Sequence, residues 1–66
     1  MAALFVRKGD PPAQYWKQTA CFAVEVGLHL PPIKVYRLRA HGTAYPLVRY
    51  YAEPELKRLF RKLQGA

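Results

Sequence analysis

The chain has 66 residues, enough for one domain, and carries a formal net charge of +7. A chain this short buries only about 60% of its unfolded surface, so the sequence predicts a single small chain without an independent core. A single cysteine excludes an internal disulfide, and the absence of serine excludes a Ser-His-Asp site. The sequence also contains no phosphate-binding glycine motif. We therefore expect no enzymatic activity, no cofactor and no metal site.

Residues 11–30 are predicted to form one long helix. Asp10 is a favourable N-cap, Pro11 suits the first helical position, and Pro31 ends the segment. Its apolar surface is wider than a solvent-exposed helix needs, which predicts burial against partner subunits or lipid. The sequence leaves open whether this helix spans a membrane or packs beside one. The partner-binding residues predicted on it are Trp16, Phe22 and Leu28.

A polar stripe on the predicted helix carries Cys21, Glu25 and His29 at intervals of four residues. Such a trio has the ligand types of a metal site. The preferred interpretation is a polar seam that faces a neighbouring subunit, with Cys21 as a small buried apolar residue.

Residues 33–52 are predicted to form an extended, irregular arm. The segment is rich in β-branched and aromatic residues, but its alternation shifts near Tyr36. Residues 41–46 have the composition of a turn. A hairpin that pairs residues 33–39 with residues 47–51 is the alternative to an arm lying across a neighbour.

Residues 54–63 are predicted to form a short amphipathic helix that begins at Pro54. Acids precede bases along it, which complements the helix dipole. Ten residues are too few for a stable isolated helix, so its apolar face is expected to dock on a partner. The predicted docking residues are Leu56, Leu59, Phe60 and Leu63.

These elements together predict a mostly α, non-globular fold with one long N-terminal helix, an extended middle arm and a short C-terminal helix. The positive charge favours an anionic partner. Tyrosines between the bases suit either stacked RNA bases or a membrane interface. The bases predicted to contact phosphates of lipid or RNA are Lys34, Arg37, Arg39, Arg49, Arg58 and Arg61.

Part of the chain resembles a small accessory subunit of mitochondrial respiratory complex I. The similar segments are Ala20–Phe22, Gly27–Leu28, Leu30–Ile33, Tyr36 and Thr43–Leu47. The resemblance implies a supernumerary subunit of the inner-membrane arm, without catalytic residues or cofactors.

The sequence therefore predicts a non-catalytic structural accessory subunit that stabilises a respiratory complex in the mitochondrial inner membrane. Its partners would be other subunits of that complex, with membrane lipid as a further contact. The alternative is a small organellar ribosomal protein that binds rRNA through the basic, tyrosine-rich arm.

Overall fold

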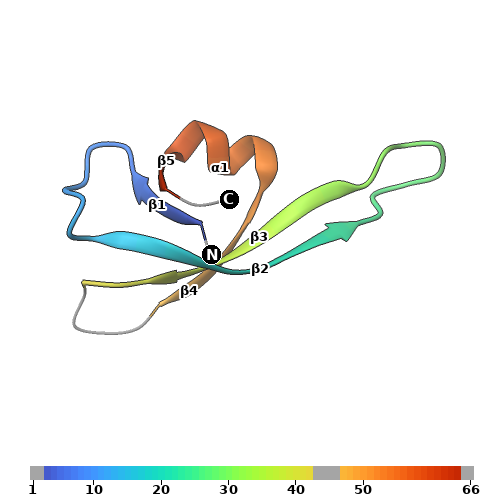
Figure 1. Cartoon of the computed structure of the whole chain (residues 1–66). Helices are drawn as coiled ribbons and strands as arrows, with labels where there is room; N and C mark the ends of the chain where they lie inside the picture. The colour runs from blue at the N-terminus through green and yellow to red at the C-terminus, as the bar shows by residue number, and fades with distance from the viewer. Residues whose placement is uncertain (1–2, 43–46, 65–66) are drawn as a thin grey trace.

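The protein is a five-stranded antiparallel sheet with one short helix (Figure 1). The structure, a computed structural model, describes residues 3–42 and 47–64. In chain order the elements are β1 (Leu4–Arg7), β2 (Tyr15–Val24), β3 (Ile33–Ala40), β4 (Val48–Ala52), α1 (Glu53–Leu59) and β5 (Phe60–Gln64). The prediction of a mostly α, non-globular fold is therefore wrong.

The sheet has the strand order β4-β3-β2-β1-β5, and each neighbouring pair is antiparallel. The first four strands follow one another as a meander, which needs only short connections. Helix α1 then carries the chain from β4 at one edge to β5 at the other. As a result, the last strand pairs with the first, and Gln64 lies beside Leu4 (Figure 1).

The long helix predicted over residues 11–30 is instead a turn, strand β2 and the loop after it. Tyr15 and Trp16 begin β2, and aromatic and β-branched side chains of this kind favour a strand. The four-residue spacing that suggested a helix does not distinguish a helix from a strand, because positions i and i+4 also share a face in a strand. Pro11 lies in a turn closed by a hydrogen bond from the Gln14 N–H to the Pro11 carbonyl, at 3.0 Å.

Strands β2 and β3 extend beyond the rest of the sheet as a hairpin (Figure 1). The molecule is elongated for this reason, with extents of 41 × 20 × 20 Å. A register shift between Gln18 and Ala20 marks a bulge in β2, and such bulges bend a strand and increase its twist.

The predicted middle arm forms β3 and β4, which pair from Val35↔Ala52 to Arg39↔Val48. Its extended backbone is confirmed, and the hairpin left open as an alternative describes it better than an irregular arm. The centre of the predicted turn, residues 43–46, lies outside the described residues.

The C-terminal helix is shorter than predicted. Its acids lie in the first turn and its bases in the last, as expected from the dipole. However, it ends at Leu59, because Phe60 adopts an extended conformation (φ −124°, ψ 156°) and begins β5. Backbone hydrogen bonding to β1 replaces the last helical turn that the apolar spacing had indicated.

The core lies between α1 and the sheet face it covers. Leu38 is fully buried at its centre, with Trp16 from β2 and Leu56 from α1. Phe60 packs edge-on against both Trp16 and Tyr51, with ring centroids 5.8 and 5.0 Å apart. In the part of the chain that the structure describes, no helix has the length and apolar character needed to cross a membrane.

Candidate functional site

The candidate site is the sheet face opposite α1, formed by β2, β3 and β4. Directly paired residues of antiparallel strands share a face, so the register defines its cross-strand rows. We call this surface the outer face; its rows are Lys17–Arg39–Val48, Ala20–Arg37–Tyr50 and Phe22–Val35–Ala52. Its bases lie in the first two of these rows, and Phe22 and Val35 lie in the third row, towards the projecting hairpin.

Two bases of the outer face oppose each other directly. Lys17 on β2 pairs in register with Arg39 on β3, and both side chains are exposed. Neither forms an ion pair within the residues that the structure describes. All four acidic residues of the chain lie outside these three strands. Like charges opposite one another destabilise a sheet, so this pair lowers the stability of the sheet.

Arg37 lies beside this pair and is held in position by Thr19. The Arg37 Nε–H donates to the Thr19 hydroxyl at 2.8 Å, and that hydroxyl donates to the Arg37 carbonyl oxygen at 3.3 Å. A guanidinium has five N–H donors. The bond to Thr19 uses one of them and fixes the plane of the group while the terminal nitrogens can contact another molecule.

Aromatic side chains lie next to these bases on the same face. Tyr50 is 58% exposed and Phe22 is 44% exposed. Their ring centroids are 6.2 Å apart in an edge-to-face arrangement. This contact limits the rotation of two large side chains that project into solvent, and it leaves part of each ring accessible.

The loop that ends the projecting hairpin is a second exposed surface, and it is mostly apolar. Val26, Leu28 and Leu30 are exposed, and Leu28 reaches 89%. In this loop His29 has a positive φ of 64°, a conformation uncommon for residues other than glycine.

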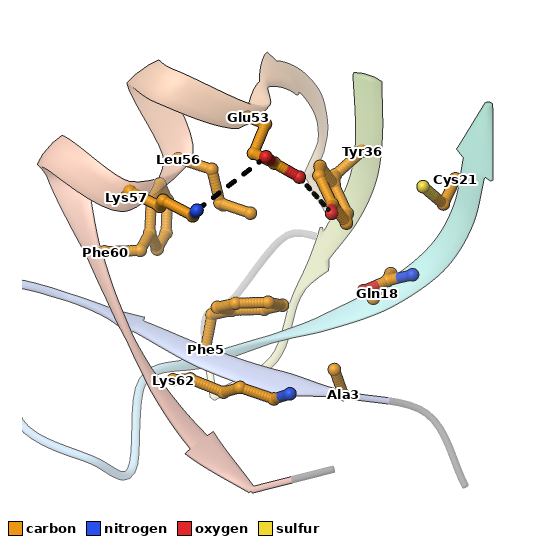
Figure 2. Close-up of a pocket in the computed structure, with 10 residues that line it drawn as sticks. All are labelled: Ala3, Phe5, Gln18, Cys21, Tyr36, Glu53, Leu56, Lys57, Phe60 and Lys62. Carbon is orange, nitrogen blue, oxygen red and sulfur yellow. Dashed lines mark hydrogen bonds and ion pairs between the residues drawn. The ribbon is translucent and has the colours of Figure 1, made fainter. Parts of the chain in front are cut away.

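A pocket of about 440 Å³ lies on the side of the sheet that α1 covers, and residues of α1, β1, β2, β3 and β5 line it (Figure 2). At its rim the Tyr36 hydroxyl donates to Glu53 Oε2 at 2.9 Å, and Lys57 Nζ lies 3.7 Å from Glu53 Oε1. The hydrogen bond to Glu53, with a smaller effect of burial, raises the pKa of Tyr36 to about 12. The same bond, with the positive charge of Lys57, lowers the pKa of Glu53.

The residues predicted to bind a partner are dispersed over the molecule. Trp16, Leu56 and Phe60 are buried in the core of the chain itself, and Leu59 packs against that core. Leu63 is partly buried on β5. Only Phe22 and Leu28, both on the hairpin, are exposed.

The predicted phosphate-contacting bases also separate. Arg37 and Arg39 lie together on the outer face, whereas Lys34 and Arg49 fall on alternate positions of their strands and so on the opposite face. Arg58 lies on α1 and Arg61 on β5. The sequence analysis did not include Lys17 among the phosphate-contacting bases. Its position opposite Arg39 becomes evident only when residues 15–24 form a strand.

The polar stripe of Cys21, Glu25 and His29 disappears with the predicted helix. Cys21 lies on β2 and is exposed, whereas Glu25 and His29 belong to the loop that follows. Within residues 3–42 and 47–64, no group of three metal-ligand side chains lies close enough to hold an ion.

Comparisons of the chain with models of protein families, with curated proteins and with solved structures find no significant match in any of the three. Its function is therefore inferred from the geometry and charge of its own surfaces.

Proposed function

We propose that the protein is a non-catalytic module that binds single-stranded nucleic acid on its outer face. Lys17, Arg37 and Arg39 contact phosphates, and unpaired bases stack on Tyr50 and Phe22. The main support for this proposal is the pair of Lys17 and Arg39. These two bases oppose each other directly, form no ion pair in the described part of the chain, and lie on a surface without acidic residues. This function belongs to the same class as the rRNA-binding alternative drawn from the sequence.

The charge arrangement supports an anionic partner. A phosphate chain presents a row of negative charges that can interact with all three. The cross-strand repulsion between Lys17 and Arg39 is maintained in the free protein at a cost of a few tenths of a kcal/mol to about 1 kcal/mol. Bound phosphates would reduce it.

The exposed rings support a single strand over a duplex. Bases in a duplex are already stacked on each other, whereas unpaired bases can stack on aromatic side chains. Each such contact contributes about 1–3 kcal/mol and depends little on base identity. The outer face therefore fits a single strand bound with little sequence preference.

The experiment is fluorescence anisotropy of a labelled single-stranded oligouridine of about 12 nucleotides, a length within the usual site sizes. With three phosphate contacts, the logarithm of the affinity should fall with a slope of about −2 against the logarithm of salt concentration. Affinity should then drop about 20-fold between about 50 and 200 mM salt. The double variant Lys17→Gln/Arg39→Gln should reduce that drop to about 3-fold.

Two controls make the test specific to the outer face. The variant Lys57→Gln/Arg58→Gln removes the same charge from α1 and should bind nearly as well as the wild type. Tyr50→Ala should weaken binding at least fivefold, whereas Tyr50→Phe should retain it, because the ring alone is needed for stacking. Equal losses in the two charge variants would indicate non-specific attraction and contradict the proposal.

The free energy of unfolding gives an independent check. Removing two opposed like charges should leave Lys17→Gln/Arg39→Gln as stable as the wild type, or slightly more stable. Weaker binding in an equally stable protein would support a binding role for the pair. Loss of stability would mean that the two bases support the fold.

The role of accessory subunit in a mitochondrial inner-membrane complex remains a prediction. The helix over residues 11–30, which was expected to pack in the membrane arm, is not present in the described residues. One observation favours a docking subunit: the exposed Leu28 and its apolar neighbours at the end of the hairpin. Cosedimentation with detergent-solubilised respiratory complexes that Leu28→Asp abolishes would support it. Cosedimentation with ribosomal particles that RNase disrupts would contradict it.

A further inference from the structure

Strand β2 has an open edge where it projects beyond β1. β1 pairs with β2 as far as Lys17, and the Gln18 N–H donates to the Ala3 carbonyl oxygen at 2.9 Å. On its other side β2 stays paired with β3 up to Val24. Within the residues that the structure describes, no strand pairs with the β1 side of residues 20–24, which form part of the projecting hairpin (Figure 1). We call this stretch the open edge; its backbone N–H and C=O groups can pair with a further strand.

The open edge carries no charged residue, unlike the other free edges of the described sheet. Residues 20–24 read Ala-Cys-Phe-Ala-Val. By contrast, β4 carries Arg49, and β5 carries Arg61 and Lys62. The start of β3, which β4 does not reach, carries Lys34 and follows two prolines. Charged side chains and prolines are the means by which natural sheets prevent pairing at their edges, so the open edge lacks this protection.

The sequence around the open edge is complementary to itself. Lys17 lies before the edge and Glu25 directly after it. Antiparallel pairing of two identical edges therefore brings the acidic end of each copy towards the basic end of the other. Between these ends the side chains are small or apolar, and Phe22 is 44% exposed. This pattern favours a second copy of the chain as the partner, although each copy has a net charge of +7.

The length of the open edge defines the register. The edge ends at β1 on one side and at the hairpin loop on the other, and its middle residue is Phe22. Two copies that use every position set Phe22 opposite Phe22 of the second copy. Cys21 then lies opposite Ala23 of the second copy, and Ala20 opposite Val24. Aromatic side chains that oppose each other across strands stabilise such a pair.

We propose that two copies of the chain pair antiparallel through their open edges, about a twofold axis at Phe22. The same residues contribute from each copy, as in any twofold interface. The two sheets become one, and both outer faces lie on the same side of it. Because so short an edge buries less than the roughly 1,200 Å² of a standard interface, the dimer is weak and forms at high concentration. Pairing does not depend on nucleic-acid binding.

The first test is sedimentation equilibrium of the full chain between about 10 μM and about 1 mM, a range suited to a weak complex. The wild type should show a monomer–dimer equilibrium. Phe22→Lys and Phe22→Glu should each be monomeric, because like charges would then oppose each other across the axis. An equimolar mixture of the two variants should dimerise again, because opposite charges would meet. Tyr50→Lys, a matched change of an exposed aromatic residue on β4, should leave self-association unchanged.

Disulfide formation tests the register. Ala23→Cys should form a covalent dimer on oxidation, because opposed Cα atoms in an antiparallel pair lie about 4.5–5.5 Å apart, within disulfide range. Val24→Cys is the control: its side chain points to the other face of the sheet from Cys21, so it should cross-link several-fold more slowly. The wild type should also be slow, because its two Cys21 residues are diagonal neighbours about 7–8 Å apart.

Self-association and nucleic-acid binding can fail separately. Arg39→Gln should weaken oligouridine binding and leave the dimer unchanged. Glu25→Gln should weaken the dimer up to about fivefold, the upper range for an exposed ion pair, without weakening oligouridine binding. The proposal would be overturned by a wild type that stays monomeric up to about 1 mM. A mixture of the two Phe22 variants no more dimeric than either alone, or equal cross-linking of Ala23→Cys and Val24→Cys, would overturn it as well.

Discussion

Phe60 joins α1 to the sheet, and its removal is expected to destabilise the fold more than any exposed substitution. The side chain is 3% exposed and packs against Trp16 and Tyr51. Replacing a buried phenylalanine with alanine costs about 3–5 kcal/mol, because apolar contact is lost and a cavity remains. A 66-residue domain has a total stability of about 3–10 kcal/mol. Phe60→Ala should therefore remove a large part of the stability, or all of it.

Guanidinium unfolding of the isolated chain measures this effect. Trp16 is the only tryptophan, and its ring lies beside Phe60, so its fluorescence reports on the core, with circular dichroism as a second probe. The sequence predicts a chain without an independent core, for which no cooperative transition would be seen. The buried cluster leads us to expect a cooperative transition for the wild type, with a lower midpoint for Phe60→Ala.

The control is Phe22→Ala, which removes the same side chain from the exposed hairpin. Phe22 has an aromatic neighbour in Tyr50 but little burial, so its loss should cost about 1 kcal/mol or less. A Phe60→Ala variant within about 1 kcal/mol of the wild type would refute the assignment of Phe60 to the core.

Two further effects on stability are expected. Because the pKa of Tyr36 is raised to about 12 from its usual 10, its contribution is complete below pH 10 and should be lost between pH 10 and about pH 12. The pKa of Glu53 is lowered, so its contribution to stability is instead lost as the pH falls below 4.5. The denaturation midpoints of the wild type and Tyr36→Phe should therefore converge at both low and high pH. Gly42→Ala should destabilise by more than about 2 kcal/mol, since φ is +78° and the new Cβ would collide with the Ala13 carbonyl oxygen. Gly9→Ala, with φ +95° and open space around it, should cost only about 1 kcal/mol in the same guanidinium unfolding assay, and equal costs would contradict the collision.

Local signals in the sequence located the beginnings of β3 and α1 closely. Pro54 lies in the first turn of α1, close to the predicted start of that helix, and Pro31 lies shortly before β3, although it ends no helix because β2 stops at Val24. These predictions succeeded because proline restricts its own φ and the backbone of the residue before it, whatever the surrounding fold. The order of acids and bases likewise identified α1, although its last turn became part of β5.

The error over residues 11–30 arose from a pattern that two structures share. Residues such as Trp16 and Ala20 are four apart, which is compatible with one face of a helix or of a strand. The bulge between Gln18 and Ala20 then shifts the alternation, so that neither period fits the whole segment. Pairing with β1 and β3 resolves this ambiguity, and such pairing depends on residues far away in the chain.

The candidate site could be anticipated only in part. The sequence by itself determined a strongly basic chain whose middle segment intersperses tyrosines among its bases, and from this Arg37 and Arg39 could be proposed as phosphate contacts. It could not determine that Lys17 lies opposite Arg39, or that Phe60 is buried and Tyr50 exposed. Strand register decides which side chains share a face, and a shift of one residue would reverse it. The tertiary structure alone sets that register, because it is fixed by contacts between strands and by the docking of α1.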